Sequence, residues 1–211
     1  MLWLHKHKLY WGKVIISTLQ TQELMFVLYK HFTERWVNLT KGVVCFGAPG
    51  NKFATAVIPM EGFLLSIKLV HVNGHLSCGK SLHQDKSKWG CPRSHPRYGG
   101  QPFNVVITTG KTNSIIYPTE LSLRNKRESL WYDKPEVEPD SPELTFGDPS
   151  HPHYVASGQE LRVWLAEDLQ NSDGKENSGK VCITAQGWFM HWTWLITWQI
   201  TWPNVIHVDL I

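Results

Sequence analysis

Short apolar runs separated by turn residues dominate the chain from Val43 onward. In the segment 63–72, Leu65, Ile67 and Leu69 alternate with polar or oppositely facing positions, which is the period of two that a half-buried strand shows. Further runs of strand length occupy 55–59, 103–109, 114–117, 143–146, 154–156, 159–169 and 179–184. Strands of this number and spacing predict an all-β fold, an antiparallel β-sandwich, and no helical pattern suggests a parallel sheet.

Two segments inside this region carry signals of their own. Asn73-Gly74 is typical of a two-residue hairpin turn, so we expect residues 75–78 to return antiparallel to the preceding strand. The segment 124–142 is charged and contains prolines, which indicates an exposed loop or insertion.

The two ends of the chain have different patterns. In residues 1–42, Leu24, Val27, Leu28 and His31 fall on neighbouring helical turns and predict an amphipathic helix in an N-terminal extension. Residues 188–211 alternate tryptophan with polar residues in a strand period, but such an aromatic stripe needs a cover. The predicted domains are therefore an extension at 1–42, a β-sandwich at 43–187 and an atypical Trp-rich tail at 188–211.

Size and charge narrow the classes of function. With 211 residues, of which 42% are hydrophobic, the chain is long enough for one domain with extensions or for two small domains. The net charge of +3, from 21 basic and 18 acidic residues, is too mild to indicate a nucleic-acid partner. The apolar run 24–29 is too short to cross a bilayer, so no stable membrane insertion is expected.

Four cysteines without a CxxC pair permit two disulfides in any of three connectivities. Cys78 and Cys91 enclose a short loop and are the favoured pair, which leaves Cys45 with Cys182. Disulfides predict an oxidising, extracellular location, and the glycosylation sequon at Asn38 is compatible with secretion. Because no secretory signal is visible, we expect the natural start to lie upstream; a cytosolic protein with free thiols is the alternative.

An oxygen-rich loop lies between the last two predicted strands. It contains side chains of the kind that bind hard cations, namely Asp168, Asn171, Asp173, Glu176 and Asn177. Calcium takes six to eight oxygen ligands, and such a loop supplies several of them. The same residue types also build ordinary solvated turns, so both interpretations stay open.

Several short motifs occur along the chain in a recognisable order. Lys88-Trp89-Gly90 is followed by His95-Pro96 and Tyr98, and later by Asp168-Leu169 and Glu176-Asn177-Ser178-Gly179. This order resembles the bacterial calcium-dependent galactose-binding lectins of the PA-IL type, which are jelly-roll β-sandwiches. The resemblance covers about residues 57–184, outside the insertion at 124–142.

The resemblance implies a non-catalytic module that binds glycans with terminal galactose or similar sugars through calcium. It assigns to calcium the Cys78 carbonyl together with Asp168, Asp173, Glu176 and Asn177. It assigns to the sugar His95, Pro96, Tyr98, Asp168 and Leu169. Three departures stand out: Glu176 replaces an asparagine, the acidic loop is one residue longer, and Cys78 stands where the family has a tyrosine, five extra residues before the tryptophan.

Other interpretations of these residues remain. Asp168 fits a turn residue that satisfies local backbone donors, His95 fits a solvent-exposed loop position, and Trp89 fits a loop anchor packed on the sandwich. The absence of GxSxG, HExxH and paired-carboxylate signatures argues against an enzyme. The rival function is an extracellular structural or adhesive sandwich without sugar binding, and the sequence leaves the oligomeric state open.

Overall fold

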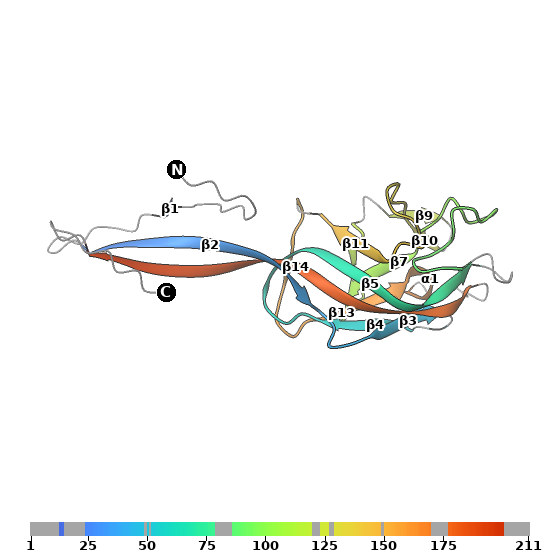
Figure 1. Ribbon diagram of the computed structural model, residues 1–211, viewed down its shortest axis with the longest axis horizontal. Coiled ribbons are helices and arrows are strands. Elements are labelled where there is room, and N and C mark those ends of the chain that lie inside the picture. Colours follow the sequence, from blue (N-terminus) through green and yellow to red (C-terminus); the bar gives the residue numbers. More distant parts are fainter. Residues whose placement is uncertain are drawn as a thin grey trace. The chain divides into compact units, whose positions relative to one another are not determined.

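The computed structural model describes residues 13–14, 24–48, 50, 52–78, 86–119, 123–126, 129–148, 150–169 and 177–200. The chain divides into two compact units, one formed by Arg35–Phe189 and the other by Met1–Glu34 together with Met190–Ile211. The first unit is an antiparallel β-sandwich (Figure 1), which confirms the predicted fold class. None of the helices in the described ranges has the length and apolar character needed to span a bilayer.

The larger sheet has eight strands in the path β1-β2-β14-β5-β11, with β12 and β6 also paired to β5 and β3 paired to β14. Its strands are β1 (Lys13–Val14), β2 (Leu24–Asn38), β3 (Val44–Ala48), β5 (Gly62–Cys78), β6 (Lys86–Ser87), β11 (Glu143–Gly147), β12 (His153–Val155) and β14 (Asn177–Ile200). The long strands β5 and β14 are central in this sheet, because each pairs with the other and with several shorter strands.

The second sheet has four strands in the order β4-β13-β7-β8. These are β4 (Ala54–Val57), β7 (Val105–Thr109), β8 (Ile115–Tyr117) and β13 (Glu160–Leu165). β13 pairs with β7 so that Leu165 lies opposite Val105. A separate hairpin joins β9 (Arg124–Lys126) to β10 (Ser129–Trp131).

The core lies between the two sheets. Alternate residues of each strand face it, as the period of two requires, and the larger sheet contributes Phe46, Ile67 and Leu69. The four-stranded sheet contributes Ile107 and Val163, among others. The disulfide between Cys45 and Cys182 joins residues that face each other on β3 and β14, so it links strands that are already in register.

A smaller apolar cluster lies on the outer face of the four-stranded sheet. Val106 and Trp164 point away from the core because they alternate with core-facing neighbours, and with Ala166 they form the buried part of this cluster. Partly buried residues from other elements pack against them, namely Phe53, Ile115, Leu123, Leu130 and Leu169. The cluster explains why the short helix α1 (Ala166–Leu169) forms directly after β13: one turn brings Leu169 onto this surface.

Two local predictions were wrong. Residues 24–38 form the strand β2 and not a helix, because the short apolar run 24–29 fits either period and pairing with β1 decides. Asn73-Gly74 is no hairpin turn, since β5 runs through it to Cys78. Gly74 has φ of 85°, and a side chain there would collide with the Lys180 carbonyl, so the glycine permits close approach of β14.

The segment 124–142 is exposed at many positions, as predicted, but it also contributes to both apolar clusters. It supplies Leu130 to the outer cluster and the fully buried Tyr132 to the main core. The Tyr132 hydroxyl donates to the Val105 carbonyl at 2.9 Å. The Tyr132 ring stacks on the Phe103 ring, with the two ring centroids 5.4 Å apart. The charged residues at its exposed positions dominate the local composition, so the composition does not indicate that Leu130 and Tyr132 are buried.

Candidate functional site

The long loop after β6 is anchored by Trp89. Its side chain is fully buried, and its indole Nε1 donates to the Ser141 carbonyl at 2.8 Å. Its backbone N–H donates to the Pro139 carbonyl at 3.1 Å. A buried indole N–H needs a hydrogen-bond acceptor. The segment 139–141 supplies this acceptor, and because it is distant in the sequence, the contact could not be predicted from the residues around Trp89. Trp89 is therefore a structural anchor of this loop.

A disulfide fastens the same loop to the end of β5. Cys78 and Cys91 are bonded, with their Cα atoms 5.5 Å apart, as the short spacing predicted. Cys91 N–H donates to the Pro102 carbonyl at 3.0 Å, which brings the beginning and end of the loop together. Both predicted disulfides are thus confirmed, and one of them holds the loop that carries His95.

His95 lies in a tight turn that orients its imidazole. Its Nδ1 accepts hydrogen bonds from the backbone N–H groups of Arg97, at 3.1 Å, and Tyr98, at 3.0 Å. An Nδ1 that accepts carries no proton, so in the neutral ring the proton lies on Nε2, which is then a donor. The Tyr98 ring packs against the imidazole at 5.0 Å, and Pro96 between them is exposed.

Arg93 ties the His95 turn to the segment 133–138. Its guanidinium donates to Asp133 Oδ1 at 2.8 Å, to the Lys134 carbonyl at 3.0 Å and to the Val137 carbonyl at 3.2 Å. The hydrogen-bonded Asp133 carboxylate raises the pKa of the Arg93 guanidinium above its ordinary value. Several simultaneous bonds from one planar group fix the loop's position more firmly than a single ion pair does.

The second half of the candidate site begins at α1. Ala166 N–H donates to the Asn104 carbonyl at 2.7 Å, and the Leu169 side chain packs in the outer apolar cluster. Asp168 lies in this helix, although its side chain is outside the described part of the structure. Leu169 can therefore offer a sugar only its backbone, since its side chain is used in packing.

Asn104 joins the two halves. Its N–H donates to the Trp89 carbonyl at 3.3 Å, while its own carbonyl accepts from Ala166. Its side-chain amide donates to the Leu130 carbonyl at 3.3 Å, and the residue is buried. The loop with His95 and the helix with Asp168 thus lie at the same end of the sandwich (Figure 1). Asn104 lies in no recognisable motif, so nothing in the sequence marks it as part of the site.

β14 and β5 bring two further predicted ligands to this end. Gly179 lies against His75 and Leu76, whereas Gly74 lies against Lys180 and Val181, so the two strands run antiparallel. Continuing that register by two residues sets Asn177 beside Cys78, where both strands end. The predicted ligands Asp173 and Glu176 fall outside the described residues, and so does the Asn177 side chain.

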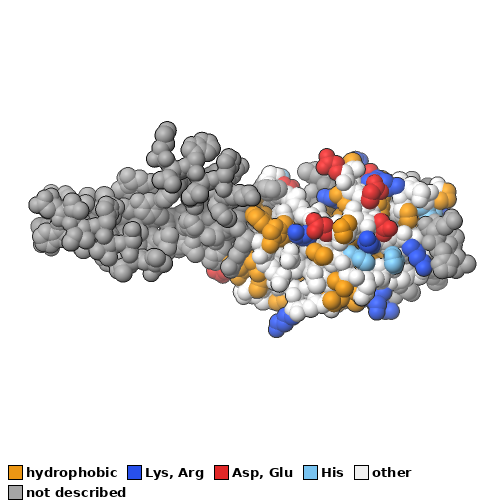
Figure 2. Space-filling model, in the orientation of Figure 1, with side chains coloured by type: hydrophobic (Ala, Val, Ile, Leu, Met, Phe, Trp, Pro, Cys, Tyr) orange, Lys and Arg blue, Asp and Glu red, His pale blue; other side chains and the backbone are white. Residues whose placement is uncertain are grey.

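The residue types that the sequence assigns to calcium are suited to a hard cation. Carboxylates, an amide and a backbone carbonyl offer oxygen, which calcium prefers over nitrogen or sulfur. The Cys78 sulfur is in a disulfide, so this residue has only its carbonyl oxygen to offer. Among the residues whose side chains are described, no cluster of three His, Cys, Asp or Glu could hold a metal. Basic and acidic side chains are interspersed on the face of the sandwich that Figure 2 shows.

The chain matches no protein-family model and no curated protein. Among solved structures it is similar to the lectin AJLec from the sea anemone Anthopleura japonica, with a TM-score of 0.64 and 33% sequence identity. The match covers 74% of this chain and 97% of AJLec. An identity of this size over nearly all of AJLec shows common descent, and the chain belongs to the family of this sea anemone lectin.

Proposed function

We propose that the chain is a calcium-dependent carbohydrate-binding protein that takes galactose-type sugars at the end of the sandwich formed by the His95 loop and α1. Calcium would be held by oxygen atoms of Cys78, Asp168, Asp173, Glu176 and Asn177. The ion would neutralise the acidic side chains and offer coordination positions to two neighbouring sugar hydroxyls. No bond is made or broken in the sugar, so no nucleophile or general base is required.

The sugar contacts follow from the chemistry of each residue. Asp168 would accept a hydrogen bond from a sugar hydroxyl in addition to its role toward calcium. His95 would donate from Nε2 to a hydroxyl on the far side of the ring, because its Nδ1 already accepts two backbone hydrogen bonds. Tyr98 and Pro96 would border the sugar, and the backbone at Leu169 would contact it.

The observation that carries this proposal is the shared attachment at Asn104. The His95 loop and the helix with Asp168 are distant in sequence, yet Asn104 hydrogen-bonds to Trp89 in one and to Ala166 in the other. The family relationship to a lectin supports the same conclusion. A site whose loop is already held by a disulfide and a buried tryptophan loses little conformational entropy on binding.

We further propose an extracellular location. Two disulfides account for all four cysteines, and such bonds persist in oxidising compartments. Extracellular fluid also has calcium at a level that suits weak sites with dissociation constants of about 10⁻⁴–10⁻³ M.

The test is retention of the full chain on immobilised galactose with calcium, followed by elution with EDTA. We expect binding that requires calcium, and we expect Asp168→Asn to weaken it by at least about tenfold, which is about 1.4 kcal/mol. Glu61→Gln is the matched control, because Glu61 is an exposed carboxylate on the turn before β5. Retention that is unchanged by EDTA and by Asp168→Asn would refute the proposal, and failure to bind any sugar resin would favour an adhesive module.

A further inference from the structure

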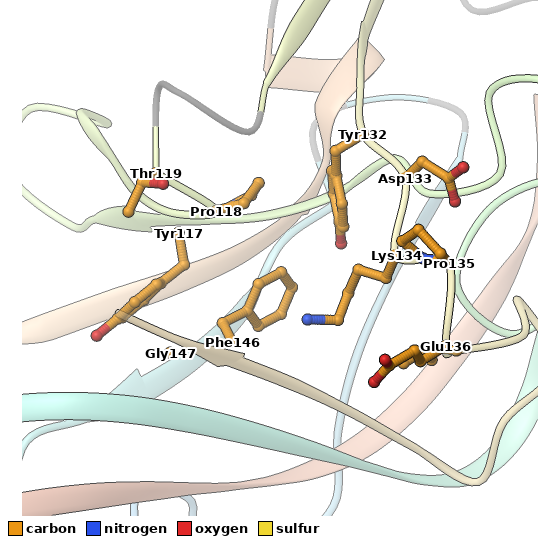
Figure 3. A pocket seen from close by; sticks show the side chains of 11 residues that line it. Tyr117, Pro118, Thr119, Tyr132, Asp133, Lys134, Pro135, Glu136, Phe146 and Gly147 are labelled. Carbon is orange, nitrogen blue, oxygen red and sulfur yellow. The ribbon is translucent and has the colours of Figure 1, made fainter. Parts of the chain in front are cut away.

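A cavity of about 390 Å³ opens beside the ends of β8 and β11. Its lining comes from these two strands and from the segment that follows β10, as Figure 3 shows: Tyr117, Pro118, Thr119, Tyr132, Asp133, Lys134, Pro135, Glu136, Val137, Phe146 and Gly147. None of these residues belongs to the candidate calcium and sugar site. The cavity is therefore a separate concave feature, of a size typical of small-molecule sites.

The aromatic walls of the cavity are rigid and their donors are already used. The Tyr117 hydroxyl donates to the Leu64 carbonyl at 3.3 Å, and the Tyr132 hydroxyl donates to the Val105 carbonyl at 2.9 Å. Burial raises the pKa of both phenols, so they remain neutral at physiological pH. The Phe146 ring packs against both tyrosine rings, and its centroid lies 6.2 Å from that of Tyr117 and 6.0 Å from that of Tyr132. These walls present a fixed apolar surface with little hydrogen-bonding capacity left.

Lys134 is the polar group that this packing does not explain. Its side chain extends toward Phe146, with the Glu136 carboxylate below it in Figure 3. Among the described residues, its ammonium makes no hydrogen bond and no ion pair within 4.0 Å. Burial lowers the pKa of Lys134, while the charge of Glu136 partly opposes this shift. A half-buried ammonium without a partner destabilises the fold, so its position requires another explanation.

The neighbouring Asp133 carboxylate does not serve as a partner for the Lys134 ammonium. Asp133 is bound by Arg93, which also holds the Lys134 and Val137 carbonyls and so fixes this wall of the cavity. Lys134 and Glu136 thus offer the cavity a donor and an exposed acceptor, beside the Thr119 hydroxyl and the Asp133 carboxylate that Arg93 binds. A free anion would be attracted by Lys134 and repelled by Glu136.

We propose that this cavity is a second, metal-independent carbohydrate subsite that binds a neutral pyranose unit of a glycan. The apolar face of a pyranose would lie against the apolar lining of the cavity, which includes Phe146 and Pro118. Two neighbouring hydroxyls can accept from Lys134 and donate to Glu136 at the same time, which neither a hydrocarbon nor an anion can do. The volume accommodates one such ring with space for a linkage to a second.

The test uses the full chain in EDTA, so that a calcium-dependent site is silent. Methyl β-D-galactoside and methyl β-D-glucoside are titrated while the backbone amide resonances are followed by NMR. We expect shifts at the amides of Thr119, Lys134 and Gly147, with dissociation constants in the millimolar range, about 1–10 mM. Lys134→Met should weaken binding by about tenfold, because a hydrogen bond to a charged donor is lost. Lys111→Met, at an exposed lysine in the β7–β8 turn, is the matched control.

Lys134→Met should also leave the melting temperature unchanged or raise it, because it removes a desolvated charge that has no partner. Should it unfold the protein, Glu136→Gln, at an exposed position, tests the acceptor in its place. The proposal fails if neither sugar shifts these amides at about 100 mM, about tenfold above the weakest expected dissociation constant. It also fails if Lys134→Met binds as wild type, or if galacturonate binds at least tenfold more tightly than the neutral sugars. Asp168→Asn should not affect this cavity, so either proposal can fail without the other.

Discussion

The two segments that meet at Asn104 are fixed in different ways. The His95 loop is held by a disulfide, a fully buried tryptophan and the multiple hydrogen bonds of Arg93. The acidic side begins with a helix of four residues, which is held by the backbone hydrogen bond from Ala166 to Asn104 and by the packing of Ala166 and Leu169. The His95 loop is therefore anchored in the core, whereas the acidic segment is attached at the surface of the sandwich through α1.

This difference fits what each side would bind under the proposed function. Three carboxylates, on Asp168, Asp173 and Glu176, fall within nine residues of the sequence and repel one another unless a cation neutralises them. The His95 loop has no such repulsion and can be ordered by the fold itself. We therefore expect changes in the loop to reduce stability, and changes in the acidic segment to reduce calcium and sugar binding with little loss of stability.

The largest expected effect is that of Trp89→Ala. It removes a fully buried indole together with its hydrogen bond to Ser141, and truncation of such a side chain costs about 3–5 kcal/mol of unfolding free energy. Denaturant unfolding without calcium measures it. Trp36→Ala, at an exposed tryptophan of β2, is the control and should cost much less. A loss below about 1 kcal/mol for Trp89→Ala would contradict the view that this loop is part of the core.

Removal of the Cys78–Cys91 disulfide should have the next largest effect. The bond closes a short loop, with a sequence separation of 13, and chain entropy predicts a loss of about 3 kcal/mol for a loop near that length. The double variant Cys78→Ser with Cys91→Ser is compared with wild type by denaturant unfolding and by calcium titration. Unfolding should become easier and calcium binding weaker, since the Cys78 carbonyl is a proposed ligand. Unchanged unfolding would mean that the other contacts hold the loop without the bond.

Arg93→Ala should have the smallest effect on stability and the most selective effect on binding. Its guanidinium is partly exposed, so we expect a loss of about 1–2 kcal/mol of unfolding free energy. Because Arg93 positions the His95 turn, and its bonds among the described residues reach only the segment 133–138, sugar affinity should fall while calcium affinity stays the same. Calorimetric titration of calcium, then of galactose, separates the two. Equal losses of both affinities would show that the loop and the acidic segment do not act independently.

Much of the sandwich and part of the site could be predicted from the sequence. The alternation in β5 and the apolar run of β13 are local properties of the chain, and they predicted strands that the structure contains. The short spacing of Cys78 and Cys91 favoured their pairing, which left Cys45 to Cys182. Asn73-Gly74 led to a wrong prediction, because a glycine suits both a turn and the close approach of another strand. Only the presence of β14 beside Gly74 distinguishes these two roles.

The sequence by itself determined the β character of the chain and the residue types at the candidate site, and the spacing of its cysteines favoured one pairing, since all of these depend on side chains and their spacing. Only the tertiary structure decided that Leu24–Asn38 is a strand, that Tyr132 belongs to the core and that Asn104 joins the His95 loop to α1. These features depend on backbone hydrogen bonds and apolar contacts between residues far apart in the chain. Such contacts leave no local pattern, because any residue can donate a backbone N–H or accept at a carbonyl.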